Sequence, residues 1–410
     1  MKKVFGFALG ILTAIGGFLD IGDLVTSSVA GSRFGLTLGW VIIVGVVGIC
    51  LFAQMSGRVA AVSGRATFEI IRERLGVRMA AANLGASFLI NLLTLAAEVG
   101  GIALALQLAS GLGYLLWVPV AAFAVWLVIW RVKFSILENV TGLLGLTLIV
   151  FAVAVFWLHP NWSALGGQFV QQFPSQSSEA PATYWYFAIG LFGSSMTPYE
   201  VFFFSSGAIE DKWTTKDLSQ SRVNVLVGFP LGGILSIAII ACSAIVLLPQ
   251  HIAVTSLSQV ALPIAQAGGR IALIIVILGF VAATFGAALE TTLSSGYALS
   301  QFFGWPWGKF RRPAKAARFH LVMIVGLLIG IGVLATGVDP VQLTEYSVVF
   351  SAVALPLTYL PILMVANDRQ YMGKLVNGRV TNFFGLIFLG IVLLASIAAI
   401  PVMIISGAGA

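Results

Sequence analysis

Residues 16–23 read GGFLDIGD, and residues 193–200 read GSSMTPYE. Each stretch lies within a long apolar segment and combines glycine or proline, which weaken a helix, with acidic side chains. An acidic side chain at the centre of a membrane helix costs roughly 2.5–3.5 kcal/mol on insertion scales, so its presence indicates a functional site. We therefore predict two interrupted membrane helices, whose breaks free backbone carbonyl oxygens beside carboxylates.

The composition of the 410 residues calls for a membrane as solvent. Hydrophobic residues make up 59% of the chain and charged residues only 9%, and the mean hydropathy is +1.02. Apolar runs of roughly 18 to 27 residues recur, each long enough to cross about 30 Å of hydrocarbon as a helix. The alternating ten-residue segments of a membrane β-barrel are missing. The predicted fold class is an all-α integral membrane protein.

We predict eleven transmembrane helices from the apolar runs. They lie at about 4–31, 36–56, 80–109, 114–130, 138–158, 184–209, 223–248, 270–300, 319–337, 342–366 and 381–406. With the N-terminus in the cytoplasm, all of the 22 Lys and Arg residues except Arg33 and Arg270 fall in cytoplasmic segments. Because basic loops stay on the cytoplasmic side, we predict a cell inner membrane protein with its N-terminus inside and its C-terminus outside.

Several functional classes are excluded by what the sequence lacks. Cys50 and Cys242 lie in separate spans and are expected to be small buried hydrophobes rather than a disulfide or metal ligands. No phosphate-binding loop of the Walker type and no His-rich, Ser/Lys or paired-Asp catalytic pattern is present. The basic residues form no stripe suited to nucleic acid. We expect a monomer in the lipid bilayer, without cofactor, that is not an enzyme.

The acidic residues inside the spans are the candidates for binding a cation. They are Asp20, Asp23, Glu98, Glu200 and Glu290. Each break places two polar side chains three residues apart, Asp20 with Asp23 and Thr197 with Glu200, so that both members can face one cavity. The spans hold almost no Lys or Arg to pair with these carboxylates. The sequence therefore predicts a negatively charged cavity and a cationic substrate.

The two breaks lie five predicted spans apart. This spacing is expected of two inverted five-helix repeats, here about 4–158 and 184–366, with an additional helix at about 381–406. We expect the whole chain, 1–410, to form a single transporter domain. No span shows a sustained polar stripe by inspection, which argues against an ion channel.

At these residues the sequence resembles the natural-resistance-associated macrophage protein (Nramp) family of divalent-metal transporters, which has the leucine-transporter-like (APC) fold. The family's Asp-Pro-Gly-Asn in span one corresponds to Asp20-Ile21-Gly22-Asp23, and its Met-Pro-His in span six to Thr197-Pro198-Tyr199. A divergent bacterial branch of the family has Ser-Pro-Tyr where this chain has Thr197-Pro198-Tyr199. Similarities such as Ala97-Glu98 in span three and Leu355-Pro356 in span ten extend over the full chain.

The resemblance implies a secondary transporter or facilitator of divalent metal cations that works by alternating access. The metal ligands that we expect are Asp20, Asp23, Thr197, Ser194 and Glu200, and the candidate residues for protons or gating are Glu98, Tyr199 and Glu290. Two proton-linked family positions differ, because His is replaced by Tyr199 and Asp by Leu95. This leaves Glu98 and Glu200 as candidate proton carriers for a symport.

The departures from the family pattern bear on the ion. Asp23 stands where the family has Asn, and Thr197 stands where it has Met, a soft thioether ligand. The family's polar Gln in span ten corresponds to Val348. A site of oxygen ligands favours hard ions of the Mg²⁺ or Mn²⁺ type. Met196, next to Thr197, stays open as the alternative ligand, and a transporter of an organic cation or amino acid with the APC fold is the alternative function.

Overall fold

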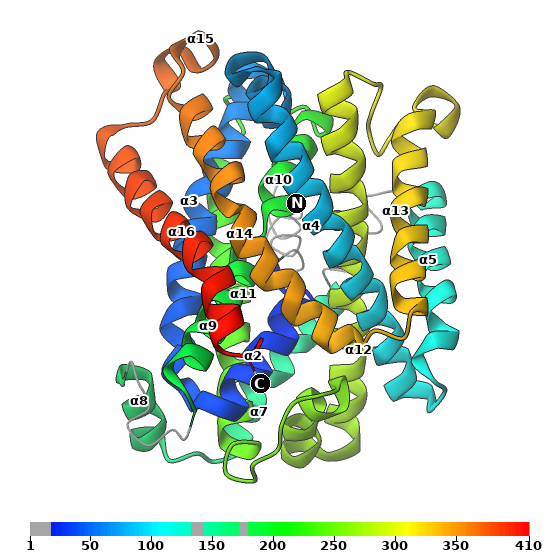
Figure 1. Cartoon of the computed structure of the whole chain (residues 1–410), viewed down its shortest axis with the longest axis vertical. Helices are drawn as coiled ribbons and strands as arrows, with labels where there is room; N and C mark the ends of the chain where they lie inside the picture. Colours follow the sequence, from blue (N-terminus) through cyan, green and yellow to red (C-terminus); the bar gives the residue numbers. More distant parts are fainter. Residues whose placement is uncertain (1–17, 133–142, 172–178, 410) are drawn as a thin grey trace.

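A computed structural model describes residues 18–132, 143–171 and 179–409 of the chain (Figure 1). Every regular element within these ranges is a helix, which confirms the predicted all-α class. The elements are α2 (Ile21–Phe34), η1 (Gly35–Leu38), α3 (Gly39–Ser63), α4 (Thr67–Ser110), α5 (Tyr114–Arg131), η2 (Leu146–Leu148), α7 (Ile149–Trp157), α8 (Trp162–Val170), α9 (Pro181–Ser195), α10 (Pro198–Glu210), α11 (Leu218–Val246), α12 (Leu257–Phe303), η3 (Pro313–Lys315), α13 (Ala317–Ala335), α14 (Pro340–Ala366), α15 (Arg369–Met372), η4 (Gly373–Leu375) and α16 (Arg379–Ile405).

Eight helical stretches among the described residues are long and apolar enough to cross a membrane. There are nine if the pair 143–157 and 162–170, bent by 115°, counts as one span. One of the eight is the continuous stretch Ile21–Ser63, which holds parts of the first two predicted spans. Helix is present in the described part of every predicted span, and the count of eleven crossings stays a prediction.

Two helices begin earlier than the sequence predicts. Helix α4 starts at Thr67 and α12 at Leu257, whereas the hydropathy places these spans from about 80 and about 270. Each has a sharp bend at a glycine, Gly76 with φ 82° and Gly269 with φ 62°. A positive φ of this size is readily adopted only by glycine. The segments before the bends are therefore short helices, and the predicted spans begin close after the bends.

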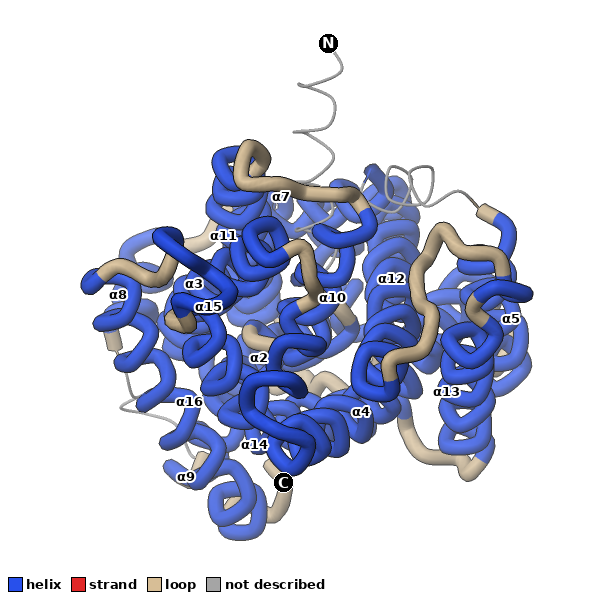
Figure 2. Tube along the Cα trace, turned by 90° about the horizontal axis from the view of Figure 1, so that it is seen from above, coloured by secondary structure: helices blue, strands red, loops and turns tan. Residues whose placement is uncertain are grey.

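The interrupted helices lie in the middle of the bundle. Seen from above, α2 and α10 are central, α5 and α13 lie at one edge, and α8 and α16 lie at the opposite edge (Figure 2). Helix α4 packs against both α12 and α14. Outer helices carry large apolar side chains that are more than half exposed, such as Leu116 on α5 and Leu394 on α16. An apolar outside around a core with polar side chains is the arrangement that a bilayer requires.

Charged side chains gather at one end of the molecule, with α15 at the top of Figure 1. Arg65 pairs there with Glu73 at 2.6 Å, and Arg74 pairs with Asp368. The backbone N–H of Gln370 and the Arg74 guanidinium together lower the pKa of the Asp368 carboxyl. We call this end, marked by Arg65, Arg74, Asp368 and α15, the basic end.

Close contacts fix α2 and α10 to their neighbours. At Gly31 of α2, a Cβ atom would lie 2.3 Å from the carbonyl oxygen of Ile240 on α11, so only glycine permits this approach. In α10, the Ser205 hydroxyl lies 2.8 Å from the hydroxyl of Thr67 at the start of α4. Ser56 of α3 donates to the carbonyl of Val201 at 2.7 Å. The two central helices are therefore held at set depths in the bundle.

Candidate metal site between the two helix breaks

The first break lies at the start of α2. Leu19 and Asp20 are not helical, and the helix begins at Ile21. Asp20 has an extended backbone and caps the helix, since its Oδ1 accepts a hydrogen bond from the backbone N–H of Asp23 at 2.9 Å. The break is where the sequence predicts it, while residues 4–17 of the predicted first span lie outside the described residues.

The second break separates α9 from α10. Helix α9 ends at Ser195 and α10 begins at Pro198, with Met196 and Thr197 outside both helices. Pro198 has no backbone N–H and its fixed φ suits the first turn of a helix, so it starts α10 at this point. The freed carbonyl of Met196 accepts a hydrogen bond from the Tyr359 hydroxyl on α14 at 3.1 Å. The interrupted sixth span is thus present as predicted.

The two breaks meet through side-chain hydrogen bonds. The Ser194 hydroxyl donates to Oδ1 of Asp23 at 3.0 Å, and the Tyr199 hydroxyl donates to Oδ2 of Asp20 at 3.3 Å. Each aspartate of the first break thereby receives a donor from the helices that flank the second break. All four side chains are at most 2% exposed. Hydrogen bonds to buried carboxylates offset part of their desolvation cost.

The three glutamates lie around this pair of aspartates. Glu98 of α4 accepts a hydrogen bond through Oε1 from the backbone N–H of Ile21 at 3.2 Å, at the N-terminus of α2. Glu200 is buried in the first turn of α10, and Glu290 is partly exposed on α12. The charges of Glu98 and Glu200 both repel those of Asp20, Asp23 and Glu290. The predicted carboxylates therefore form one electrostatic group.

Several oxygens of this group have no hydrogen-bond partner among the described residues. They include Oδ2 of Asp23 and Oε2 of Glu98. Thr197 Oγ1 and Glu200 Oε2 also lack a hydrogen-bond partner, although the two side chains lie close together. A buried, unsatisfied polar atom costs about 1–3 kcal/mol, and more when it is charged. A cation bound at Asp23 would satisfy the free oxygen of that carboxylate, and no basic side chain forms an ion pair with the two aspartates within the described ranges.

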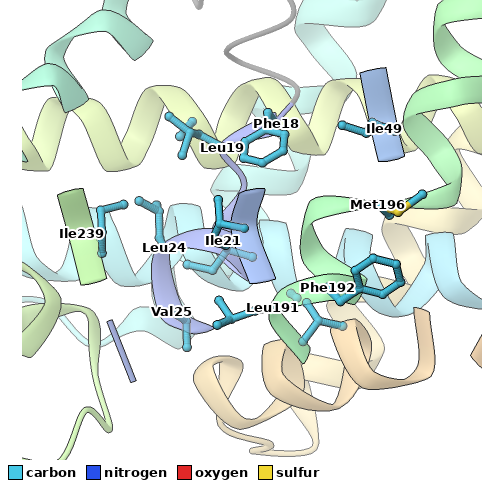
Figure 3. Packing of buried hydrophobic residues seen from close by; sticks show 14 of the residues in the cluster. Phe18, Leu19, Ile21, Leu24, Val25, Ile49, Leu191, Phe192, Met196 and Ile239 are labelled. Atoms are coloured by element: carbon cyan, nitrogen blue, oxygen red, sulfur yellow. The ribbon is translucent and has the colours of Figure 1, made fainter. Parts of the chain in front are cut away.

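The Met196 side chain packs against α3. Its sulfur lies so close to Gly48 of α3 that a Cβ atom there would be 2.6 Å from Sδ. Figure 3 shows the side chain beside Phe192, within the cluster of buried apolar residues. In this conformation the thioether belongs to the apolar core, whereas Thr197 lies beside Glu200.

The ligand set is poor in charged groups. Among the residues that the structure describes, no three His, Cys, Asp or Glu side chains converge closely enough to hold a metal ion. An ion between the breaks would have Asp20 and Asp23 as charged ligands, with hydroxyl, carbonyl or water oxygens completing its shell. Such a shell of oxygens with retained waters suits a hard divalent ion.

Two residues of α14 complete the surroundings of the breaks. Tyr359, which binds the Met196 carbonyl, was not among the predicted site residues, although a tyrosine between prolines in an apolar span was a usable signal. Val348 lies directly against both breaks, since Cβ atoms added at Gly22 or Gly193 would meet it at 2.9 Å and 2.2 Å. The sequence aligns Val348 with the polar Gln of the family's span ten. Its contact with the two glycines could not be predicted, because that contact depends on how the helices pack.

The chain is similar to known proteins over most of its length. The sequence matches the family described as natural resistance-associated macrophage protein-like over residues 10–401. Its curated relatives include the divalent metal cation transporter MntH of Deinococcus radiodurans, 24% identical over 94% of this chain and 87% of the relative. MntH of Pectobacterium carotovorum is 23% identical over 88% of this chain and 86% of the relative.

Solved structures of the same architecture were also found. The manganese transporter of Eremococcus coleocola, in complex with an aromatic bis-isothiourea compound, has a TM-score of 0.72 at 19% identity and covers 97% of this chain and 87% of its own. Mhp1, a nucleobase-cation-symport-1 transporter in a closed conformation, has a TM-score of 0.63 at 15% identity and covers 97% and 91%. At these identities the likeness concerns the fold.

Ser194 and Ser195 provide a matched test of the contact between the breaks. Ser194→Ala removes the donor to Asp23, whereas Ser195→Ala removes only a hydrogen bond to the Leu191 carbonyl. Because groups that orient a ligand typically contribute 10–100-fold to metal affinity, we expect Ser194→Ala to weaken Mn²⁺ binding about tenfold in calorimetric titration of the purified protein. Ser195→Ala should bind like the parent chain. Equal affinities of the two variants would contradict this geometry.

Proposed function

Because the chain belongs to the natural resistance-associated macrophage protein (Nramp) family, we propose that it carries divalent metal cations across the cell inner membrane. The relatives named above are divalent metal cation transporters rather than enzymes. The observation that carries the proposal is the pair of buried aspartates, Asp20 and Asp23, each held by a hydroxyl from the other broken helix. Ionisable groups inside a membrane bundle mark ion pathways.

The proposed ion is a hard divalent cation of the Mg²⁺ or Mn²⁺ type. Thr197 and Ser194 offer hydroxyl oxygens, and the thioether of the neighbouring Met196 lies in the apolar core. Oxygen-only shells do not discriminate strongly for transition metals, whereas thioether ligands favour softer ions. With two charged ligands, the ion would keep several of its waters, which is common for Mg²⁺. The site would therefore select ions by their size and hydration more than by their preference for sulfur ligands.

The proposed mechanism is alternating access. Asp20 and Asp23 are at most 2% exposed, and Val348 of α14 lies against glycines of both breaks. An ion could reach or leave such a site only if α2, α9, α10 and α14 changed their relative positions. Rocking of one helix group against another around a fixed central site is the general solution for transporters with broken helices.

The basic end is proposed to face the cytoplasm, in keeping with the positive-inside rule. Glu98 is proposed to carry a coupled proton, because one of its oxygens holds the start of α2 while the other has no partner among the described residues. A proton on that second oxygen would change the charge beside the ion without breaking the contact to Ile21. Ion and proton would then compete electrostatically for one site.

Uptake into proteoliposomes tests the proposed function. We expect the parent chain to carry Mg²⁺ and Mn²⁺ with a change in internal pH, and the double variant Asp20→Asn/Asp23→Asn to fall to the level of empty vesicles, because both charged ligands are lost. Asp211→Asn, at the exposed end of α10, is the matched control and should transport normally. Undiminished transport by the double variant would rule out this site. Uptake of amino acids or organic cations without metal uptake would favour the alternative function.

A change at Thr197 tests the choice of ion. Thr197→Met adds a thioether at the break, so we expect the ratio of Cd²⁺ to Mg²⁺ transport to rise about tenfold, because sulfur favours soft ions. Met196→Leu replaces a side chain of the apolar core and should leave that ratio unchanged. The oxygen-site proposal fails if Met196→Leu shifts the ratio while Thr197→Met does not.

A further inference from the structure

Helix α4 carries a stripe of buried polar side chains that leads from the candidate site toward the basic end. Asn83, Ser87, Asn91, Thr94 and Glu98 follow one another at spacings of four, four, three and four residues, so they share one face of the helix. All five are buried, with exposed fractions between 0 and 6%. We call Asn83, Ser87, Asn91 and Thr94 the α4 polar stripe.

The opposite side of α4 at the same depth is apolar and exposed. Leu89 is 64% exposed, and Ala81, Ala82 and Gly85 are exposed as well. In lipid this pattern means that the polar side chains turn inward while the apolar ones meet the acyl chains. From the sequence, no span is expected to carry a sustained polar stripe, and this expectation is wrong for α4. Asn, Ser and Thr scattered among apolar residues do not stand out until one face of the helix is known to be buried.

The two ends of the stripe are fixed by contacts. Near the basic end, Asn83 donates to the carbonyl of Leu357 on α14, and Ser87 donates to Oδ1 of Asn83 at 3.2 Å. Beyond the other end, one turn after Thr94, Glu98 accepts a hydrogen bond from the backbone N–H of Ile21 beside Asp20. The stripe therefore joins the break in the first span to the basic end, where the segment of α4 before Gly76 pairs with charged residues.

Helix α14 faces the stripe in a matching antiparallel register. Asn83 contacts Leu357, and Gly100 lies against Pro340. Between these contacts α4 advances by 100 − 83 = 17 residues and α14 by 357 − 340 = 17. Ser351 therefore lies at the depth of Ser87 to Asn91.

Buried oxygens from three helices remain unsatisfied around the stripe. Oδ1 of Asn91, Oγ of Ser351 and Oγ1 of Thr291 on α12 have no hydrogen-bond partner among the described residues. Helix α12 runs antiparallel to α4, since Thr284 meets Gly101 and the carbonyl of Phe302 accepts a bond from Arg72. Thr291 thus lies about two turns nearer the basic end than Gly101.

Hydrogen bonding between helices explains only part of the stripe. Polar side chains commonly join membrane helices, and Asn83 and Ser87 do so here. This role does not explain Asn91, Ser351 and Thr291, because an inter-helix bond would satisfy their oxygens. Buried polar atoms that lack protein partners are satisfied by water or by a ligand. A row of neutral oxygens beside an acidic site is suited to a hydrated cation, which it can contact without trapping.

We propose that the α4 polar stripe lines the path by which a partly hydrated divalent cation moves between the site at Asp20 and Asp23 and the cytoplasm. This inference rests on the proposed transport function. Neutral amide and hydroxyl oxygens replace lost waters one at a time, and the absence of charge from the stripe itself lets the ion move on. The path opens when the helices around the site separate at the basic end.

Cysteine labelling tests the path. The native Cys50 and Cys242 are both buried and are replaced by alanine. Ser87→Cys then puts a thiol on the stripe, and Leu89→Cys puts one at the same depth on the lipid side. Each variant's own Mn²⁺ uptake in inside-out vesicles, measured before labelling, is the reference. A charged, membrane-impermeant thiol reagent is then added to the cytoplasmic face.

We expect Ser87→Cys to react at least tenfold faster than Leu89→Cys, and its uptake to be lost once the adduct fills the path. Asn91→Leu should slow uptake about tenfold without weakening Mn²⁺ binding, since it removes an oxygen from the path and not from the site. A Ser87→Cys variant that transports Mn²⁺ but resists the reagent would overturn the path and leave the transport function intact. If the parent chain moves no divalent ion, the transport function fails and the path fails with it.

Discussion

Carboxylates inside a membrane protein obtain no hydrogen bonds from lipid tails, so the protein or bound water must supply them. The structure meets this constraint by interrupting two helices at the same place. Asp20 caps α2 with its own side chain, Ser194 reaches Asp23 from the end of α9, and Tyr199 reaches Asp20 from the start of α10. These contacts give three of the four aspartate oxygens a hydrogen-bond donor, and the fourth, Oδ2 of Asp23, has none among the described residues.

The surrounding helices hold this meeting point in place. Glycine contacts let α2 approach α11 and let α14 approach both breaks, and hydroxyl contacts tie α10 to α3 and α4. Tyr359 secures the carbonyl that the second break releases. The same principle extends along α4, where a polar face is buried and an apolar face meets lipid. The site and its proposed path are thus parts of one polar interior within an apolar shell.

Much of this arrangement could be predicted from single residues. Glycine, proline and acidic side chains in apolar runs predicted both breaks, because each is costly in an unbroken membrane helix. Ser194 was among the predicted ligands. Its hydrogen bond to Asp23 could not be predicted, because it depends on how the two breaks face each other. The direction of the Met196 side chain could not be predicted. Met196 and Thr197 lie outside both helices, so the regular spacing of a helix does not fix where their side chains point. The early starts of α4 and α12 were not predicted because the segments before Gly76 and Gly269 are too short to be recognised as spans from hydropathy.

The central claim is that a divalent cation binds by oxygen ligands between the two breaks. Anomalous X-ray diffraction from crystals of this protein grown with Mn²⁺ measures it most directly. The account predicts one strong manganese peak within about 2.0–2.6 Å of carboxylate oxygens of both Asp20 and Asp23, with the Met196 sulfur outside the coordination shell. A peak coordinated by that sulfur, or no peak between the breaks at a saturating Mn²⁺ concentration, would contradict it.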